Sequence, residues 1–164
     1  MYGGCKGIGA LMPKCYQLIG VPASGKSTWV ANQEWAKDCA YISTDSWVEL
    51  YAKEQGKTYS EVFVEYMPKA VNIMTEHVKL AKDAGQDIIW DQTSTTVKSR
   101  ARKFNMLHDY EHIAVVFRCP DVDDLTRRLL SRPGKLIPVD VLHDMIKNFE
   151  VPTEEEGFKE IWYA

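Results

Sequence analysis

The sequence lacks any apolar run near the roughly 20 residues that cross a bilayer, so we expect no transmembrane helix. The net charge is small, at −3 from 20 basic and 23 acidic residues. This balance argues against a large nonspecific nucleic-acid surface but not against a local basic groove. No Cys-x-x-Cys pair occurs among the four cysteines, which are Cys5, Cys15, Cys39 and Cys119. A zinc or disulfide framework is therefore not expected, and reduced thiols in a cytoplasmic protein are.

The N-terminal segment Met1–Lys14 lacks the apolar core of a signal peptide. It contains four glycines and a short apolar patch, Ile8–Met12, so we expect a flexible leader. Residues 15–164 contain no repeat, low-complexity tract or linker. We expect them to form one domain of the common size.

The most informative feature is the segment Gly20–Ser27, Gly-Val-Pro-Ala-Ser-Gly-Lys-Ser, which fits the phosphate-binding P-loop motif. An apolar strand is expected before it and a helix after it, as the motif requires. Its backbone amides can surround a triphosphate, and the ammonium of Lys26 can reach the β- and γ-phosphates. The hydroxyl of Ser27 can ligate Mg²⁺. The sequence therefore predicts a nucleotide-binding protein, with a Gly-rich structural turn as the alternative.

Short apolar runs alternate with longer helical stretches, which predicts an α/β fold with a central parallel sheet flanked by helices. The expected strands are Cys15–Ile19, Ala40–Ser43, Asp87–Trp90, His112–Arg118 and Glu160–Tyr163. The expected helices are Thr28–Lys37, one from Ser46 onward, Thr58–Lys82, Asp121–Leu130 and Pro138–Phe149. Thr58 and Glu61 are spaced as a capping box, and Pro68 is expected to kink or divide its helix.

Two carboxylates follow predicted strands, Asp45 after the second and Asp91 after the third. The C-terminal ends of strands in such a sheet meet at one ligand crevice, so both should face the phosphates. Asp45 could take the proton of an attacking hydroxyl, and Asp91 could hold a Mg²⁺-bound water or orient the acceptor. The alternative for each is a cap of a helix or strand end. No guanine-reading Asn-Lys-x-Asp motif occurs, and Asp91–Ser94 lacks the glycine of an Asp-x-x-Gly switch.

From about Cys15 to Ile161 the chain resembles the kinase domain of the polynucleotide 5′-kinases. The P-loop and the Thr-Trp that follows it carry this resemblance, together with Ile42-Ser-Thr-Asp45 and Ile88-Ile-Trp-Asp-Gln-Thr93. A fourth element is Arg127–Leu142, which is similar to the arginine-bearing lid of that family and the Pro-x-x-Val-Leu helix after it.

The resemblance implies an ATP- and Mg²⁺-dependent kinase with Asp45 as general base. Lid arginines Arg128 and Arg132 would contact the ATP phosphates, whereas Arg127 fits a solvated helix face. The expected catalytic residues are Lys26, Asp45, Asp91 and Arg132, and the expected metal ligands are Ser27 and Asp91. The expected nucleotide-binding residues are Gly20, Val21, Pro22, Ala23, Ser24, Gly25, Lys26, Ser27, Thr28, Arg128 and Arg132.

The resemblance also implies a nucleic acid as phosphate acceptor, with DNA favoured over RNA. The acceptor could be a 5′-hydroxyl end or a hydroxymethyl base, as for phage DNA-modifying kinases such as 5-hydroxymethyluracil DNA kinases. A phage-encoded protein would act in the host cytoplasm. A small-molecule or nucleoside kinase of the same fold and a non-catalytic nucleotide-dependent binding module are the alternatives.

Three features bear on the acceptor. The phage polynucleotide kinase carries an acceptor-side arginine three residues after its base, where this chain has Val48. A basic run could meet a phosphate backbone or form an exposed helix face; it consists of Lys98, Arg100, Arg102 and Lys103. Three aromatic residues could stack on bases or pack in the core; they are Trp47, Tyr51 and Tyr59.

Overall fold

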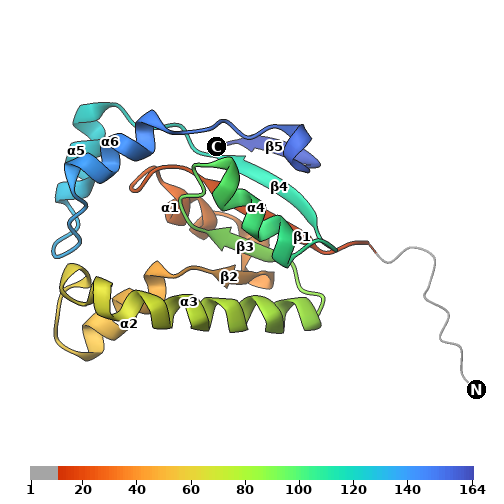
Figure 1. Ribbon diagram of the computed structural model, residues 1–164, viewed down its shortest axis with the longest axis horizontal. Coiled ribbons are helices and arrows are strands. Elements are labelled where there is room, and N and C mark those ends of the chain that lie inside the picture. The colour runs from red at the N-terminus through yellow and green to blue at the C-terminus, as the bar shows by residue number, and fades with distance from the viewer. Residues whose placement is uncertain (1–10) are drawn as a thin grey trace, which may run out of the picture.

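A five-stranded parallel sheet forms the centre of the computed structural model, which describes residues 11–164 (Figure 1). Its strands run in the order β2-β3-β1-β4-β5. Their bounds are Lys14–Ile19 for β1, Ala40–Ile42 for β2, Ile88–Asp91 for β3, Glu111–Val116 for β4 and Glu160–Tyr163 for β5. The predicted α/β fold is confirmed, and each expected strand is present with small changes at its ends.

The central strand β1 is buried on both faces because helices cover both sides of the sheet. It pairs with β3 on one side and β4 on the other, with Tyr16 in register between Ile89 and Ile113. The P-loop therefore leaves the middle of the sheet, and Asp91 ends the neighbouring strand. This topology brings the P-loop and Asp91 to the same edge, as expected for parallel strands.

Helices pack on both faces of the sheet, whereas α5 and α6 lie away from it, at the upper left of Figure 1. On one face, α3 and the end of α4 pack on β1, β2 and β3 through a cluster that includes Met74, Val78, Trp90 and Leu107. On the other face, α1 and the 3₁₀ helix η1 pack through Trp29 and Trp35. The helices are α1 Lys26–Ala31, α2 Asp45–Glu54, α3 Tyr59–Asp83, α4 Val97–Met106, α5 Val122–Leu130 and α6 Val139–Lys147, with η1 Glu34–Asp38 and η2 Glu154–Glu156.

Helix signals in the sequence have mixed outcomes. The capping box of α3 forms as predicted, with Thr58 accepting from the amide of Glu61 and Glu61 accepting from that of Thr58. Pro68 lies inside α3 without dividing it. The predicted helix Thr28–Lys37 is wrong in its bounds, because α1 begins at Lys26 and ends at Ala31, before η1.

The leader prediction lies mostly outside the described residues, which begin at Leu11. Lys14 already belongs to β1, where its amide donates to the carboxylate of Asp87 at 2.8 Å. Within residues 11–164, no helix is both long and apolar enough to cross a membrane.

Arg100 supports the loop that leads from β3 to α4. Its side chain has 0% exposure and binds both carboxylate oxygens of Glu156, at 2.8 and 3.1 Å. It also donates to the carbonyl of Ser94, whose φ of 49° is left-handed. The adjacent Thr93 carbonyl accepts from the amide of Gly20 at 3.0 Å. A buried cation of α4 thus fixes the loop that holds the start of the P-loop.

Arg100→Met should lower the free energy of unfolding by about 3–5 kcal/mol, because Glu156 would keep a largely buried charge without its partner. Urea denaturation measures this change. Arg102→Met on the exposed side of the same helix is the matched control and should change stability by no more than about 0.5 kcal/mol. Equal effects of the two substitutions would contradict the supporting role of Arg100.

Candidate active site

The P-loop forms the strand-to-helix turn between β1 and α1. Gly25 precedes α1 with φ of +98°, a conformation that glycine adopts without strain. The Oγ atom of Ser24 is buried and has no hydrogen-bond partner in the described part of the chain. Because buried polar atoms normally have partners, an anionic group with acceptor oxygens fits this loop.

Lys26 lies at the start of α1 and folds back on the loop. Its ammonium donates to the carbonyls of Gly20 and Val21, at 2.9 Å each. Burial lowers the pKa of Lys26 to about 8, an effect that the nearby carboxylates of Asp91 and Asp45 oppose. A phosphate group would offer stronger acceptors than the two carbonyls, so Lys26 is available to an anionic ligand.

Two of the lid arginines approach the P-loop. The Arg128 guanidinium donates to the carbonyl of Ala23 at 3.1 Å and pairs with Asp124 at 2.7 Å. The Arg132 side chain has no hydrogen bond or ion pair to any residue between 11 and 164, and its charge contributes to the lowered pKa of Lys26. Among residues 11–164 Arg127 pairs with Asp124 alone, and it is 76% exposed, as predicted for a solvated helix face.

An open pocket of about 990 Å³ lies between the P-loop and the lid arginines. Several predicted phosphate-binding residues line it, namely Ala23, Ser24, Gly25, Ser27, Thr28, Arg128 and Arg132. This donor set fits the phosphates of ATP, because the Ser24 hydroxyl and the Arg132 guanidinium have no partner in the part of the chain that the structure describes. The exposed hydroxyl of Ser27 is a suitable oxygen ligand for Mg²⁺.

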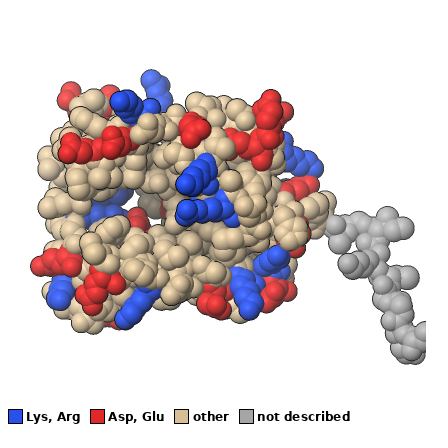
Figure 2. All heavy atoms as spheres, viewed as in Figure 1, with Lys and Arg blue, Asp and Glu red and all other residues tan. Residues whose placement is uncertain are grey.

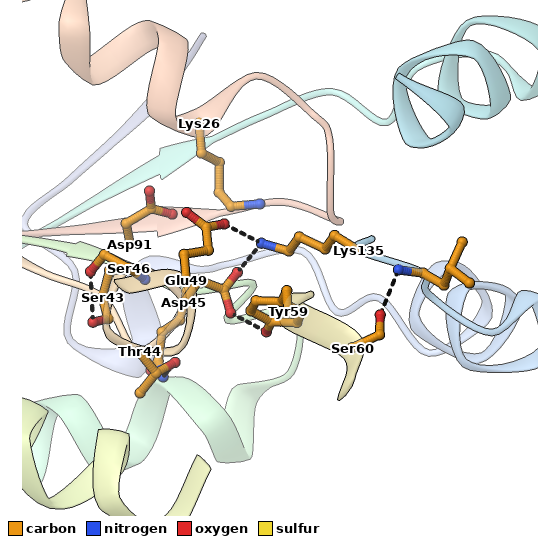
Figure 3. A network of polar contacts seen from close by, with 12 residues as sticks. Lys26, Ser43, Thr44, Asp45, Ser46, Glu49, Tyr59, Ser60, Asp91 and Lys135 are labelled. Carbon is orange, nitrogen blue, oxygen red and sulfur yellow. Dashed lines mark hydrogen bonds and ion pairs between the residues drawn. The ribbon is translucent and has the colours of Figure 1, made fainter. Parts of the chain in front are cut away.

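Asp45 is the first residue of α2, and both of its carboxylate oxygens bind side chains (Figure 3). Oδ1 accepts from the Tyr59 hydroxyl at 2.7 Å, and Oδ2 pairs with the Lys135 ammonium at 3.0 Å. Lys135 also pairs with Glu49 at 3.0 Å. The helix-cap alternative for Asp45 is wrong, because Thr44 is the N-cap residue and the amide of Ser46 donates to the Oγ of Ser43.

Asp91 ends β3 and lies close enough to Lys26 to interact with its charge. Its carboxylate accepts a hydrogen bond from the hydroxyl of Tyr41. Burial raises the pKa of Asp91, whereas the Tyr41 hydrogen bond and the Lys26 charge lower it. A divalent cation beside this carboxylate would further favour its ionised form. The strand-end cap is not observed, since no backbone amide between residues 11 and 164 donates to Asp91.

Sequence reasoning missed four residues around these carboxylates: Tyr41, Glu49, Tyr59 as a partner of Asp45, and Lys135. Lys135 interacts with Asp45 across 90 residues of chain, so local patterns carried little information about it. The available signal was its place in the lid beside Arg132-Pro-Gly.

The basic run Lys98, Arg100, Arg102 and Lys103 is exposed at only two of its four positions. Arg100 is buried at 0% exposure and Lys103 at 4%, so neither can meet a phosphate backbone. Lys103 donates to the carbonyl of Ser99 and lies 5.3 Å from the ring centroid of Trp90. Lys98 and Arg102 are exposed. Basic side chains gather over α4 at the centre of the face drawn in Figure 2.

Val48 does not face the candidate site. Its side chain has 0% exposure and packs between α2 and α3 with Ala52, Val62 and Ala70. An arginine here would place its charge in this core and would not contact an acceptor. Core packing is confirmed for all three aromatic residues, which pack against this cluster. Tyr51 also stacks on Tyr66 with 4.0 Å between centroids, and Trp47 packs edge-on against His77.

Comparisons with known proteins agree with this architecture. Residues 17–152 match the family model AAA_33, an AAA domain. A Chloroflexus aurantiacus protein provisionally described as a kinase is similar with a TM-score of 0.70 and 18% identity, over 94% of this chain and 88% of that chain.

Two further structures share the fold. A chain of the Pnkp1/Rnl/Hen1 RNA repair complex has a TM-score of 0.63 and 20% identity, over 87% of this chain and 46% of that chain. A gluconokinase from Sinorhizobium meliloti has a TM-score of 0.54 and 16% identity, over 94% of this chain and 83% of that chain. The chain therefore belongs to the AAA domain family AAA_33, and its fold is that of a P-loop kinase domain.

Proposed function

We propose that this protein is an ATP- and Mg²⁺-dependent kinase that transfers the γ-phosphoryl group to a hydroxyl of a nucleic acid. The observation that carries the proposal is that four charged side chains from three segments lie close enough to Lys26 to affect its charge, namely Asp45 of α2, Asp91 of β3, and Arg132 and Lys135 of the loop between α5 and α6. Phosphoryl transfer needs cations around the moving group and a base beside the attacking oxygen. These side chains supply both requirements.

The donor would bind between the P-loop and the lid. Residues 20–28, together with Arg128 and Arg132, would hold the phosphates, and Ser27 and Asp91 would hold Mg²⁺. The metal would neutralise charge that develops on the phosphate oxygens. Arg132 would stabilise the same oxygens with a planar, permanently charged group.

The acceptor would enter on the side of Asp45. As its hydroxyl oxygen attacks the γ-phosphorus, the bond from that phosphorus to ADP breaks, and Asp45 takes the hydroxyl proton. Figure 2 shows a hollow on this side of the molecule, between α5–α6 and α2–α3, with basic and acidic side chains visible in it. The ion pairs of Lys135 with Asp45 and Glu49 join these two parts of the molecule.

A nucleic-acid acceptor is supported by the lid sequence, by the exposed Lys98 and Arg102, and by the likeness to a chain of an RNA repair complex. A 5′-hydroxyl end and a hydroxymethyl base are the two forms of acceptor we propose, with DNA tested before RNA. A small-molecule kinase is the second candidate. The carboxylates of Asp45, Glu49 and Asp91 favour it, because they repel a polyanionic acceptor.

Transfer of labelled γ-phosphate to a panel of acceptors tests the proposal. The panel contains 5′-hydroxyl DNA and RNA oligonucleotides, hydroxymethylated duplex DNA, nucleosides and small alcohols. We expect labelling of a nucleic acid. Labelling of small alcohols alone would favour the second candidate, and ATP binding without any transfer would favour a nucleotide-dependent binding module.

Substitution of Arg132 by lysine should affect kcat much more than the same substitution of Arg127. Arg132→Lys should lower kcat roughly tenfold or more, because an ammonium cannot make the two-pronged contact of a guanidinium with phosphate oxygens. Arg127→Lys is the matched control and should change kcat less than twofold, since Arg127 is exposed and pairs with its helix neighbour Asp124. Steady-state kinetics measure both, and equal small effects would remove the lid from the mechanism.

A further inference from the structure

The lid loop, residues 131–138, is docked on the start of α3. The amide of Ser60 donates to the carbonyl of Gly134 at 3.0 Å, and the amide of Leu136 donates to the Oγ of Ser60 at 2.8 Å. Gly134 has φ of +75°, and a Cβ atom there would lie 2.7 Å from the Thr58 side chain. Only glycine permits so close an approach of the loop to α3.

Lys135 lies between these two backbone contacts, and its side chain is 13% exposed. Its ammonium pairs with Asp45 and Glu49 at 3.0 Å each and lies 4.4 Å from the ring centroid of Tyr59 (Figure 3). The two carboxylates are about half exposed, at 52% and 56%. One lid cation is therefore shared by two carboxylates of α2, separated by one helical turn.

The contacts of Lys135 restrict Asp45. Its Oδ2 is held by Lys135 and its Oδ1 by the Tyr59 hydroxyl, so a water molecule near Asp45 competes with two charged or polar groups for the same oxygens. Glu49 offers Lys135 a second anchor of the same kind at the same distance. Lys135 can therefore release Asp45 without losing its ion pair to α2.

We propose that Lys135 is a positioning residue that shields Asp45 until the acceptor arrives, and this inference rests on the proposed function. In the docked lid, Lys135 occupies Oδ2 of Asp45 and keeps water from using it as a base. An acceptor hydroxyl replaces Lys135 on Oδ2, and Lys135 stays on Glu49. The consequence is that ATP is spent on transfer and not on hydrolysis.

Removal of the Lys135 charge and removal of its second anchor, Glu49, should have opposite effects on the ratio of ATP hydrolysis to transfer. Lys135→Met keeps the length of the side chain and the backbone contacts of the lid, but it leaves Oδ2 of Asp45 accessible to water. ATP hydrolysis without acceptor should rise about fivefold relative to transfer, the scale of one such ion pair. Glu49→Gln weakens the second anchor, so Lys135 stays on Asp45; the same ratio should fall and kcat for transfer should drop about threefold.

The experiment measures ADP release and labelled product in parallel, with and without acceptor. Lys37→Met, which removes an exposed lysine paired with Glu34, is the matched control and should leave the ratio unchanged. In the double variant Lys135→Met/Asp45→Asn the extra hydrolysis should disappear, because the unshielded base is absent. A structural defect of the lid would lower both rates together and would not depend on Asp45.

An active protein whose Lys135→Met variant keeps the original ratio overturns this inference and leaves the proposed function intact. A protein that neither hydrolyses ATP nor phosphorylates any acceptor overturns both. Hydrogen exchange checks the lid without catalysis: the amides of Ser60 and Leu136 should exchange slowly in the nucleotide-free protein. Rapid exchange at both positions would overturn the docked lid on which the inference depends.

Discussion

Asp45→Asn should lower turnover by about two to four orders of magnitude while the affinity for ATP stays nearly unchanged, since the amide cannot accept a proton. The substitution keeps an oxygen for the Tyr59 hydroxyl and loses the ion pair with Lys135. Because Asp45 is half exposed, the free energy of unfolding should change by no more than about 1 kcal/mol. Single-turnover transfer, ATP titration and urea denaturation measure the three quantities.

Asp83→Asn is the control for this experiment, because it removes an exposed carboxylate at the far end of α3. Its turnover should match that of the unmodified protein. Normal transfer by Asp45→Asn would show that the carboxylate serves only to bind Tyr59 and Lys135. A loss of ATP binding equal to the loss of turnover would place Asp45 on the donor side instead.

Lys26→Ala should reduce transfer by about 10²–10³-fold and weaken ATP binding, because its ammonium is the cation that the P-loop itself provides. Lys37→Ala, at an exposed position of η1, should behave as the unmodified protein. Calorimetric titration with ATP and initial-rate assays test this pair. A folded Lys26→Ala protein with normal turnover would contradict the assignment of residues 20–27 as a nucleotide-binding P-loop.

The lowered pKa of Lys26 leads us to expect that ATP binding depends on pH. Its pKa of about 8 in the free protein means that the ammonium loses its proton as the pH rises through 8. The bound phosphates would favour the protonated form, so binding above pH 8 should take up a proton and affinity should fall with rising pH. Calorimetry in two buffers of different ionisation enthalpy measures the uptake. Lys26→Ala should abolish it.

The sheet could be predicted from the sequence because its strands are short apolar runs between helical stretches. The P-loop and the cap formed by Thr58 and Glu61 could be predicted because both depend on neighbours within a few residues. The bounds of α1 could not, since its end depends on how Trp29 and Trp35 pack against the sheet. Local patterns specify an element better than they specify where it stops.

The tertiary contacts of individual side chains were harder to predict because their partners are distant in sequence. Arg100 looked like part of a solvated basic run, and only its pairing with Glu156, 56 residues away, explains its burial. Val48 follows Asp45 by three positions, yet it faces the core that α2 forms with α3. Residue type identified the candidates, whereas tertiary contacts decided which of them face the cleft.

The position of β1 in the sheet has a consequence for biosynthesis. Of the five described strands this one is made first, but its two neighbours are β3 and β4, so Cys15 pairs with Ile88 on one side and His112 on the other. Both edges of this apolar strand are therefore paired only after about a hundred further residues have been synthesised, which takes roughly 5–20 seconds at usual elongation rates. During that interval β1 can pair with other chains. Synthesis at low temperature or with a chaperone that covers short apolar segments should raise the yield of folded protein.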